Sequence, residues 1–370
     1  MKGVKGPYAL ISYNSKDKKI WFGRDPLGRN LTPSLFVASH FDQGLALQSV
    51  EDQPSSPEFL KASRLLRVTL DDLVKRMVTG ISSLHQKTEK ESRVAVLFSG
   101  GLDCTTLALL AHSHIPPSES IDLLNVAFEN TQLISNNHQT KRIQKDSEKS
   151  TADNHDSDTT FDVPDRQTGE RSWRELSKLT PGRDWRFYLE HKEKIIKLMR
   201  PNLTVMDLSI AAALYFAARG IGNSHLNERH PPMIYRTPAR VLISGLGADE
   251  LLRGYSRHQS AFLTTSLSSN NQGKTRISTR NLGRDDQMMS WFGLEVRHPL
   301  LNRRVIDLLS GLPVHLKPDH GLGKGLGDNL LLRGLAHGLR LVESCRLPKR
   351  AIQFGAQSAK LDGNSKGQAG

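Results

Sequence analysis

A serine, two glycines and an aspartate stand close together in the segment "LFSGGLDCTT", which covers residues 97–106. An apolar run ends just before Ser99, and a second apolar run with helical character follows Asp103. The backbone N–H groups of a glycine-rich turn and the positive end of a helix dipole both attract anions. We therefore expect this loop to bind a phosphate or pyrophosphate group.

Asp103 carries a negative charge in a loop that suits an anion, and two interpretations of it stay open. Its carboxylate could hold a divalent cation that bridges phosphate oxygens, with magnesium as the natural choice. Alternatively, Asp103 caps the helix that follows. The two neighbouring glycines favour the first interpretation. The loop matches neither the G-x-x-x-x-G-K-[ST] pattern nor the dinucleotide pattern G-x-G-x-x-G.

A second segment, "LISGLGADELLRGY" at residues 242–255, has the same organisation. A strand-like run leads into small residues, and Asp249 and Glu250 then stand at the start of a helix. In a doubly wound sheet, loops that follow parallel strands reach the same edge, where ligands collect. The two segments together predict a metal-bound nucleotide, whereas simple complementation of the helix dipole is the alternative role for the two acids.

The surrounding sequence alternates between strand-like and helix-like runs. We expect strands in "RVAVLF", "IDLLNVAFE", "DWRFYLE" and "RVLISG", and helices in "CTTLALLAHSH", "GERSWRELSKL" and "VMDLSIAAALYFAARG". This alternation predicts an α/β fold with a doubly wound parallel sheet and a helical C-terminal part. The first 50 residues instead predict short antiparallel strands, including "YALISYN" and "IWFGRD", and a helix is expected from about Leu66 to Leu84.

Composition limits the class of partner. The 370 residues carry a net charge of +13, which favours anionic partners, but the basic residues are scattered, so we expect no nucleic acid partner. The only two cysteines, Cys104 and Cys345, exclude a disulfide framework and a cysteine-based zinc site. The N-terminus lacks a signal-peptide pattern and no long apolar run occurs, so a cytoplasmic protein without a membrane partner is expected.

Together the two loops resemble the PP-loop ATP pyrophosphatases, and among these the synthetase domain of the asparagine synthetase family. That family carries S-G-G-x-D-S and S-G-E-G-A-D-E, and this chain has "SGGLDC" and "SGLGADE". The segments "VPDRQTGERSWREL", "GLEVRHPLLN" and "LPKRAIQFG" also resemble the family, and the likeness runs from Arg93 to about Lys360. It implies a PP-loop fold similar to the adenine nucleotide alpha hydrolases.

The resemblance also implies an activity: with ATP and Mg²⁺, the β-carboxylate of aspartate is adenylated, and ammonia then displaces AMP to give asparagine. It assigns ATP binding to matching residues, which are Leu97, Ser99, Gly100, Gly101, Asp103, Cys104, Val126, Ser244 and Gly245. It assigns magnesium to Asp103 and Asp249, with Glu250 in support. Lys349 matches a lysine near the reacting phosphate, where a cation stabilises developing charge.

Leu246 stands where the family has a glutamate that is associated with forming and using the adenylate. Because general-base assistance is typically worth about 10²–10⁴-fold, a leucine here predicts weak or absent activity. A catalytically inactive nucleotide-binding or regulatory protein is therefore an alternative function. A second alternative, which follows from the net charge of +13, is a PP-loop enzyme that modifies transfer RNA.

Full-length members of the family begin with a glutaminase domain whose second residue is a nucleophilic cysteine, and this chain has Lys2 there. Residues 1–50 resemble only a remnant of that glutamine amidotransferase domain, so we expect no glutaminase activity. We expect a linker at 51–92, a synthetase domain at 93–355 with a disordered insertion near 131–160, and a flexible tail at 356–370. Further residues match family motifs without an assigned role, namely Arg284, Asp285, Asp286, Glu295 and Arg297.

Overall fold

The computed structural model of the chain describes residues 9–14, 19–24, 56–81, 91–128, 163–188, 205–225, 231, 233–252, 281–319, 327–348 and 350. Lys2, Lys349, the expected insertion near 131–160 and the expected tail at 356–370 lie outside these residues. Two compact units can be distinguished. Unit 1 comprises Met1–Leu73, Gly245–Gly283 and His298–Leu335, and unit 2 comprises Val74–Ser244, Arg284–Arg297 and Ala336–Gly370.

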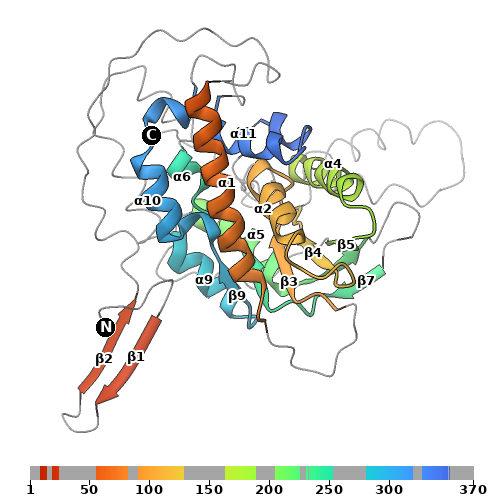
Figure 1. Cartoon of the computed structure of the whole chain (residues 1–370). Coiled ribbons are helices and arrows are strands. Elements are labelled where there is room, and N and C mark those ends of the chain that lie inside the picture. Colours follow the sequence, from red (N-terminus) through yellow and green to blue (C-terminus); the bar gives the residue numbers. More distant parts are fainter. Residues whose placement is uncertain are drawn as a thin grey trace, which may run out of the picture. The chain divides into compact units, whose positions relative to one another are not determined.

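Unit 2 is built on a five-stranded parallel sheet (Figure 1). Its strands are β3 (Val94–Leu97), β4 (Ile121–Leu124), β5 (Trp185–Tyr188), β8 (Val241–Ile243) and β9 (Glu295–Arg297). Every neighbouring pair in the order β5-β4-β3-β8-β9 is parallel. The predicted α/β fold with a parallel sheet is confirmed.

The order of the strands creates a switch point in this sheet. From β3 the chain moves outward through β4 to β5, and it later returns to the other side of β3 to form β8 and β9. The register pairs Val96 with Ile243, so β3 and β8 end at the same edge. In open α/β sheets ligands bind at the carboxyl ends of the strands where the order reverses. The edge between β3 and β8 is therefore the expected binding edge of unit 2.

Four of these strands, β3, β4, β5 and β8, were predicted from the sequence and β9 was not, and burial explains the difference between β3 and β9. Val94, Ala95 and Val96 of β3 are 0% exposed, as is typical of a strand covered on both faces. The strand β9 was not predicted, since it has only three residues and Glu295 is exposed. Its place is fixed by backbone pairing, in which Glu295 N donates to Arg240 O at 2.8 Å.

The helices of unit 2 cover the sheet. They include α2 (Leu102–His112), α4 (Pro164–Leu179), α5 (Val205–Arg219) and α9 (Leu282–Ser290), the last of which starts at the unit boundary. A hairpin of β6 (Ile221–Ser224) and β7 (Met233–Arg236), which the sequence did not predict, adds two antiparallel strands. The helix predicted at residues 169–179 begins earlier, at Pro164, because proline is favoured in the first turn of a helix.

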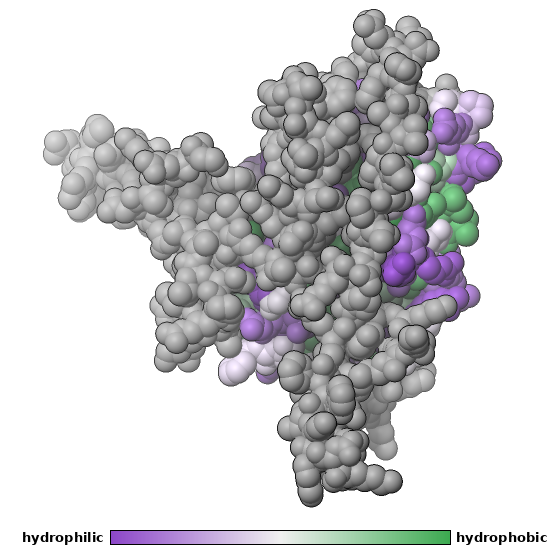
Figure 2. Space-filling model, turned by 90° about the vertical axis from the view of Figure 1, so that its left-hand side faces the viewer, coloured by the Kyte–Doolittle hydropathy of each residue, from purple (hydrophilic) through white to green (hydrophobic). Residues whose placement is uncertain are grey.

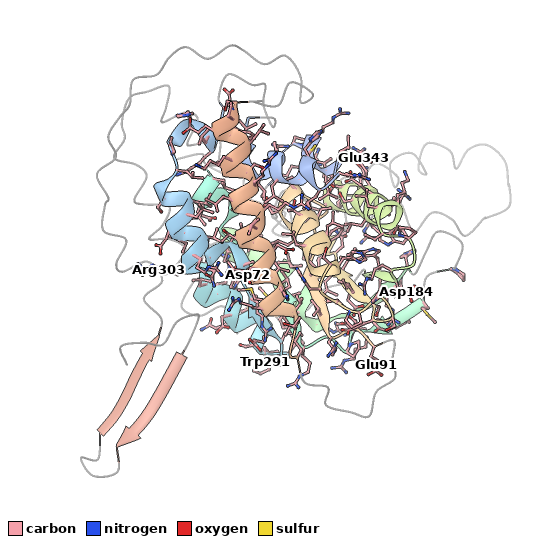
Figure 3. The ribbon with its side chains drawn as sticks, in the orientation of Figure 1. Asp72, Glu91, Asp184, Trp291, Arg303 and Glu343 are labelled. Carbon is pink, nitrogen blue, oxygen red and sulfur yellow. The ribbon has the colours of Figure 1, made fainter. Side chains whose placement is uncertain are left out.

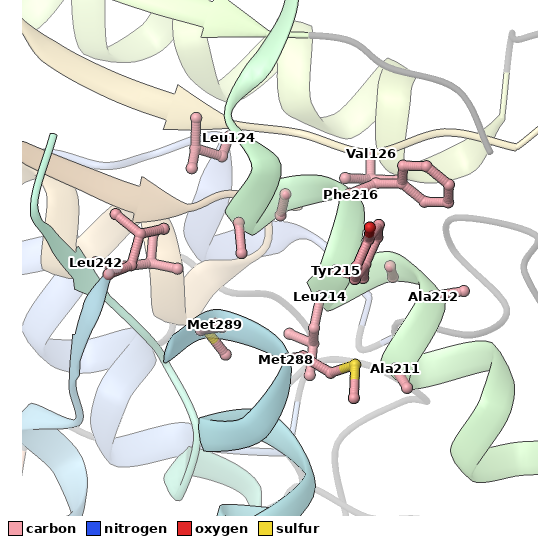
Figure 4. Close-up of a cluster of buried hydrophobic side chains, with 14 of the residues drawn as sticks. Leu124, Val126, Ala211, Ala212, Leu214, Tyr215, Phe216, Leu242, Met288 and Met289 are labelled. Carbon is pink, nitrogen blue, oxygen red and sulfur yellow. The ribbon is translucent and has the colours of Figure 1, made fainter. Parts of the chain in front are cut away.

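The main hydrophobic core of unit 2 lies between the sheet and α5 (Figure 4). Leu124 of β4 and Leu242 of β8 pack there with Phe216 of α5 and with Met288 and Met289 of α9. Successive strand residues point to opposite faces, so the alternate residues of β3, β4 and β8 face away from this cluster. The sheet is thus buried on both sides, which holds its carboxyl edge rigidly.

Unit 1 contains most of α1 (Pro57–Val78), which the sequence predicts at the wrong position, near Leu66 to Leu84. The helix begins at Pro57 because Ser56 Oγ accepts a hydrogen bond from Phe59 N at 3.1 Å, as an N-cap residue does. It ends before Gly80, which has a positive φ of 72°. The exposed hydrophobic residues of α1 are Leu60, Leu65 and Val68.

Among the described residues, no helix combines the length and apolar character that crossing a membrane requires.

The remaining described elements of unit 1 are short. The strands β1 (Ala9–Asn14) and β2 (Lys19–Arg24) pair antiparallel, as predicted. The helices are α6 (Ala248–Leu252), η5 (Pro299–Leu301), α10 (Arg303–Gly311), η6 (Val314–Leu316) and α11 (Leu330–Gly338), of which α11 ends beyond the boundary of the unit. The side-chain view shows Arg303 of α10 at the surface (Figure 3). In the view of Figure 2, hydrophilic and hydrophobic residues lie side by side on the described surface.

Stability should depend on pH through His112 and His298. Burial and the nearby Arg183 lower the pKa of His112, whose Nδ1 accepts a hydrogen bond from Arg183 Nε at 2.9 Å. Burial lowers the pKa of His298 to about 4. Both groups bind protons more readily in the unfolded chain, where the pKa is about 6.5, so their contribution is complete above that pH. It is lost as the pH falls through the lowered pKa of each group, which for His298 is about 4.

We therefore expect the urea concentration at the midpoint of unfolding to be lower at pH 5 than at pH 7.5, because these two pH values lie below and above the unfolded-state pKa of histidine. The His112→Gln variant keeps an acceptor for Arg183 but does not titrate, so its midpoint should fall less steeply than that of the wild type. An equal slope in both proteins would show that His112 plays no part in the acid response.

Candidate functional site

The loop after β3 leads directly into α2, whose N-terminus is not capped by a side chain. The N-cap residue is Gly101, with φ −69° and ψ 170°, and it makes no side-chain capping hydrogen bond. The capping interpretation of Asp103 is therefore wrong, since this residue lies inside the first turn of the helix. The first N–H groups of a helix have no partner within it. The end of α2 therefore keeps the character of an anion site.

The two glycines of the loop have different surroundings, and these suggest different roles. Gly100 has a φ of 76°, and a Cβ atom there would lie 2.4 Å from backbone atoms of Thr168 and Gly169 in α4. Gly100 is thus required for close packing against α4. Among the described residues, a Cβ atom at Gly101 would meet only Ser99 Oγ, at 3.4 Å, so this part of the chain leaves space for a ligand beside Gly101.

Hydroxyl groups of α4 hold the backbone of this loop. Thr168 Oγ1 donates to Ser99 O at 2.9 Å, and Ser172 Oγ donates to Gly100 O at 2.7 Å. Sequence reasoning missed these residues. The signal was present, because Thr168 and Ser172 are four residues apart on one helix face, with Gly169 next to them.

Glu175 extends this support to η7 (Ser344–Arg346), which also belongs to unit 2. Its carboxylate accepts hydrogen bonds from Glu343 N at 2.7 Å, from Ser344 N at 3.0 Å and from the Ser344 hydroxyl. Ser344 Oγ lies 3.2 Å from Ser172 Oγ. Ser172 and Ser344 are 0% exposed and Glu175 is 6% exposed, whereas Glu343, which is labelled in Figure 3, is exposed. Buried hydrogen bonds therefore tie η7 to Glu175 of α4 and Ser172 of α4 to Gly100, and the close approach of the two serine hydroxyls brings these two groups of bonds together.

Asn125 ties the ends of β3 and β4 to the start of α4. Its Nδ2 donates to Phe98 O at 2.9 Å and to Asp165 O at 3.0 Å, and its Oδ1 accepts from Arg166 Nε at 3.2 Å. Asn125 is only 2% exposed. Since all these bonds lie at the carboxyl edge of the sheet, they fix the floor of the candidate site.

Cys104 lies beneath the loop. Its Sγ donates to Gly101 O at 3.3 Å, and burial raises the pKa of the thiol to about 11. The thiol is therefore protonated at neutral pH, and the thiolate that nucleophilic chemistry needs is rare. Cys104 supports the turn in the place where the family has a serine.

The sheet brings several of the predicted nucleotide residues to one edge. Leu97, Val126 and Ser244 follow or end the adjacent strands β3, β4 and β8. Val126 belongs to the hydrophobic core and Leu97 packs against it, while Ser244 N donates to Arg297 O at 3.0 Å. Contact of these residues with adenine or ribose stays a prediction.

The second predicted loop begins unit 1. Gly247 has a φ of 103°, and a Cβ atom there would lie 2.4 Å from Leu301 Cδ2, so only glycine fits without displacing η5. Asp249 and Glu250 lie half-buried in the first turn of α6, and Leu246 is half-buried before it. Asp249 Oδ1 accepts a hydrogen bond from Asn329 Nδ2 at 3.0 Å. Sequence reasoning missed Asn329, as it missed Thr168 and Ser172.

The family-motif residues without an assigned role form pairs within unit 2. Arg284 and Asp285 are 3% and 4% exposed and form an ion pair at 2.7 Å. Arg297 pairs with Glu295 at 2.9 Å, and Arg297 also donates to Met77 O. Asp286 is exposed, and Lys349 lies outside the described residues.

Comparison with known proteins identifies the relatives of this chain. A family model described as "Asparagine synthase" matches residues 273–339. The chain is 38% identical over 330 residues to "Asparagine synthetase domain-containing protein 1" of Gallus gallus, covering 80% of this chain and 52% of the relative. It is 40% identical over 296 residues to the Mus musculus protein of that name, covering 74% and 47%.

Longer alignments exist with two other relatives. An asparagine synthetase domain-containing protein of Drosophila melanogaster is 34% identical over 484 residues, with 100% of this chain and 80% of the relative covered. One of Saccharomyces cerevisiae is 32% identical over 425 residues, with 99% and 74% covered. The chain spans about half the length of the vertebrate relatives that it matches.

Proposed function

The chain belongs to the asparagine synthetase family, and we propose that it is an ATP-dependent amide ligase. In the proposed reaction, a β-carboxylate oxygen of aspartate attacks the α-phosphorus of ATP and pyrophosphate leaves. Ammonia then attacks the acyl carbon of the adenylate, loses a proton and displaces AMP, so that asparagine is formed. The proposed substrates are therefore ATP, aspartate and free ammonia, with no nucleic acid partner.

The N-terminus of α2 is the observation that carries this proposal. It stands at the switch point of the sheet, its cap residue Gly101 offers no side-chain acceptor, and the space beside Gly101 is open. The α2 dipole and its first amides attract the pyrophosphate group of ATP. Thr168 and Ser172 hold the carbonyls of Ser99 and Gly100, so the loop is already ordered before ATP arrives.

The assignment of magnesium to Asp103 and Asp249 comes from the resemblance. Each residue, taken within its own unit, offers the hard carboxylate oxygens that suit Mg²⁺. Asn329 Oδ1, next to Asp249, is buried and lacks a hydrogen-bond partner within the described residues. Bound magnesium would neutralise charge on the departing pyrophosphate. By resemblance, Glu250 would support the ligands and Lys349 would stabilise charge on the α-phosphoryl oxygens.

A pyrophosphate-release assay with ATP, magnesium, aspartate and ammonia tests the proposal. We expect release that requires aspartate, and an Asp103→Asn variant should lose most of it because the carboxylate ligand is gone. A protein that binds ATP without releasing pyrophosphate under any of these conditions would instead have the second candidate function, a nucleotide-binding protein without catalysis. Leu246 is the residue that favours this second function.

The Leu246→Glu variant distinguishes the two functions further. If a missing general base limits the reaction, restoring the carboxylate should raise aspartate-dependent pyrophosphate release by about 10²–10⁴-fold. Leu246→Gln is the matched control, because glutamine has a shape similar to that of glutamate but cannot accept a proton at neutral pH. Equal rates in the wild type and in both variants would contradict a role for this position in catalysis.

A further inference from the structure

Asn329 begins α11 with an uncommon backbone conformation. Its φ is 54°, in the left-handed region that residues other than glycine seldom adopt. Its carbonyl accepts hydrogen bonds from Leu332 N at 2.9 Å and from Arg333 N at 3.0 Å. The second of these is the first hydrogen bond of the α-helix, so Asn329 occupies the N-cap position.

The side chain of Asn329 does not act as a cap. In an N-cap asparagine, the side-chain oxygen normally accepts a hydrogen bond from an amide of the first turn. Here Oδ1 is buried without a hydrogen-bond partner in the described part of the chain, and Nδ2 donates to Asp249 Oδ1 at 3.0 Å. Asn329 is 2% exposed. The capping bond is thus forgone, and a buried amide oxygen is left unpaired, while the bond to Asp249 is kept.

The chemistry of the two groups fixes the orientation of the amide. An ionised carboxylate only accepts hydrogen bonds, so the NH₂ group of Asn329 must face Asp249 and its oxygen must face away. A neutral donor orients a carboxylate but leaves its charge available, whereas lysine or arginine would neutralise it. Carboxylates that bind metals are commonly held by such hydrogen bonds.

We propose that Asn329 is a positioning residue that holds the carboxylate of Asp249 in place for magnesium and ATP. This inference rests on the proposed function, because it takes Asp249 as a metal ligand. Asn329 Oδ1 suits a water of the hydrated cation, since Mg²⁺ usually keeps several of its waters in proteins. In this proposal Asn329 would act on the cation only through the Asp249 carboxylate and a water of hydration, and it would take no part in making or breaking bonds.

The Asn329→Gly variant separates this role from the role in the turn. Glycine adopts a positive φ without cost, so the turn before α11 should fold as in the wild type, but the donor to Asp249 is lost. Arg340 also has a positive φ, of 68°, and Arg340→Gly is the matched control. Both variants should keep the wild-type Tm within a few degrees, because neither strains the backbone.

The measurement is the binding of Mn²⁺, followed by its electron paramagnetic resonance signal, to the protein with ATP. We expect Asn329→Gly to weaken Mn²⁺ binding by about 10- to 100-fold, while Arg340→Gly leaves it unchanged. In an Asp249→Asn background, Asn329→Gly should add no further loss, because both changes remove the same interaction.

The outcomes separate this inference from the proposed function. If the wild type binds Mn²⁺ with ATP and Asn329→Gly binds it equally well, or if the losses in the double variant add up, the inference is overturned and the proposed function stands. If the wild type shows no binding of ATP that depends on the cation, the proposed function is overturned together with the inference.

Discussion

The Gly100→Ala variant is expected to lose at least about 2 kcal/mol of unfolding free energy. Alanine at a φ of 76° is strained, and its Cβ would lie 2.4 Å from the backbone of Thr168 and Gly169. Backbone atoms of a helix cannot move aside as the end of a long side chain can, so the loop and α4 must separate. Denaturant unfolding measures the loss directly.

Gly101→Ala is the matched comparison, one residue further along the chain. Gly101 has a φ of −69°, and its added Cβ would meet only Ser99 Oγ at 3.4 Å. Because alanine is a poorer N-cap residue than glycine, this variant should lose about 1 kcal/mol of unfolding free energy, which is less than the loss for Gly100→Ala. It should also bind ATP more weakly, because the methyl group occupies the side of the loop where the ligand is expected. Equal unfolding free energies for the two variants would refute the different roles assigned to the two glycines.

The Glu175→Ala variant is expected to lose about 3 kcal/mol of unfolding free energy. Its carboxylate accepts three hydrogen bonds from Glu343 and Ser344, and these donors lie where water does not easily replace the lost acceptor. Because Ser344 also contacts Ser172, which holds Gly100, the loop should loosen and ATP binding should weaken as well. Denaturant unfolding and ATP titration measure the two effects.

Glu170→Gln, on the same helix, is the control for Glu175→Ala. Glu170 pairs with Arg174 at 3.4 Å, and both side chains are exposed, so the loss of this pair should cost less than about 0.5 kcal/mol. A small effect for Glu175→Ala, comparable with that of Glu170→Gln, would mean that the buried hydrogen bonds contribute little to the order of the loop.

Four strands of the parallel sheet were predictable, and three of them share one physical property. β3, β4 and β8 are apolar apart from Asp122 of β4, because both faces of the sheet are covered, and such runs are visible in the sequence. The three-residue strand β9 and the hairpin β6–β7 have no such pattern, since their residues are partly exposed. They exist because neighbouring backbone groups pair with them. The helix α1 was displaced because Ser56 and Pro57 set its start more strongly than its apolar pattern does.

Some features of the candidate site were likewise predictable from sequence, and others were not. The residue types alone indicated a glycine-rich loop with Asp103 before a helix and a similar loop with Asp249, because each is a local pattern that sterics and charge interpret directly. The resemblance to the family indicated that Leu246 stands in the place of an acid. Only the tertiary structure decided which glycine faces α4, that Gly101 is the helix cap, and that Glu175, Ser172 and Asn329 support the two loops. Apart from the local cap at Gly101, these facts depend on contacts between residues far apart in the sequence, such as Ser172 with Gly100 and Asn329 with Asp249. Such contacts form only when the packed fold brings the segments together.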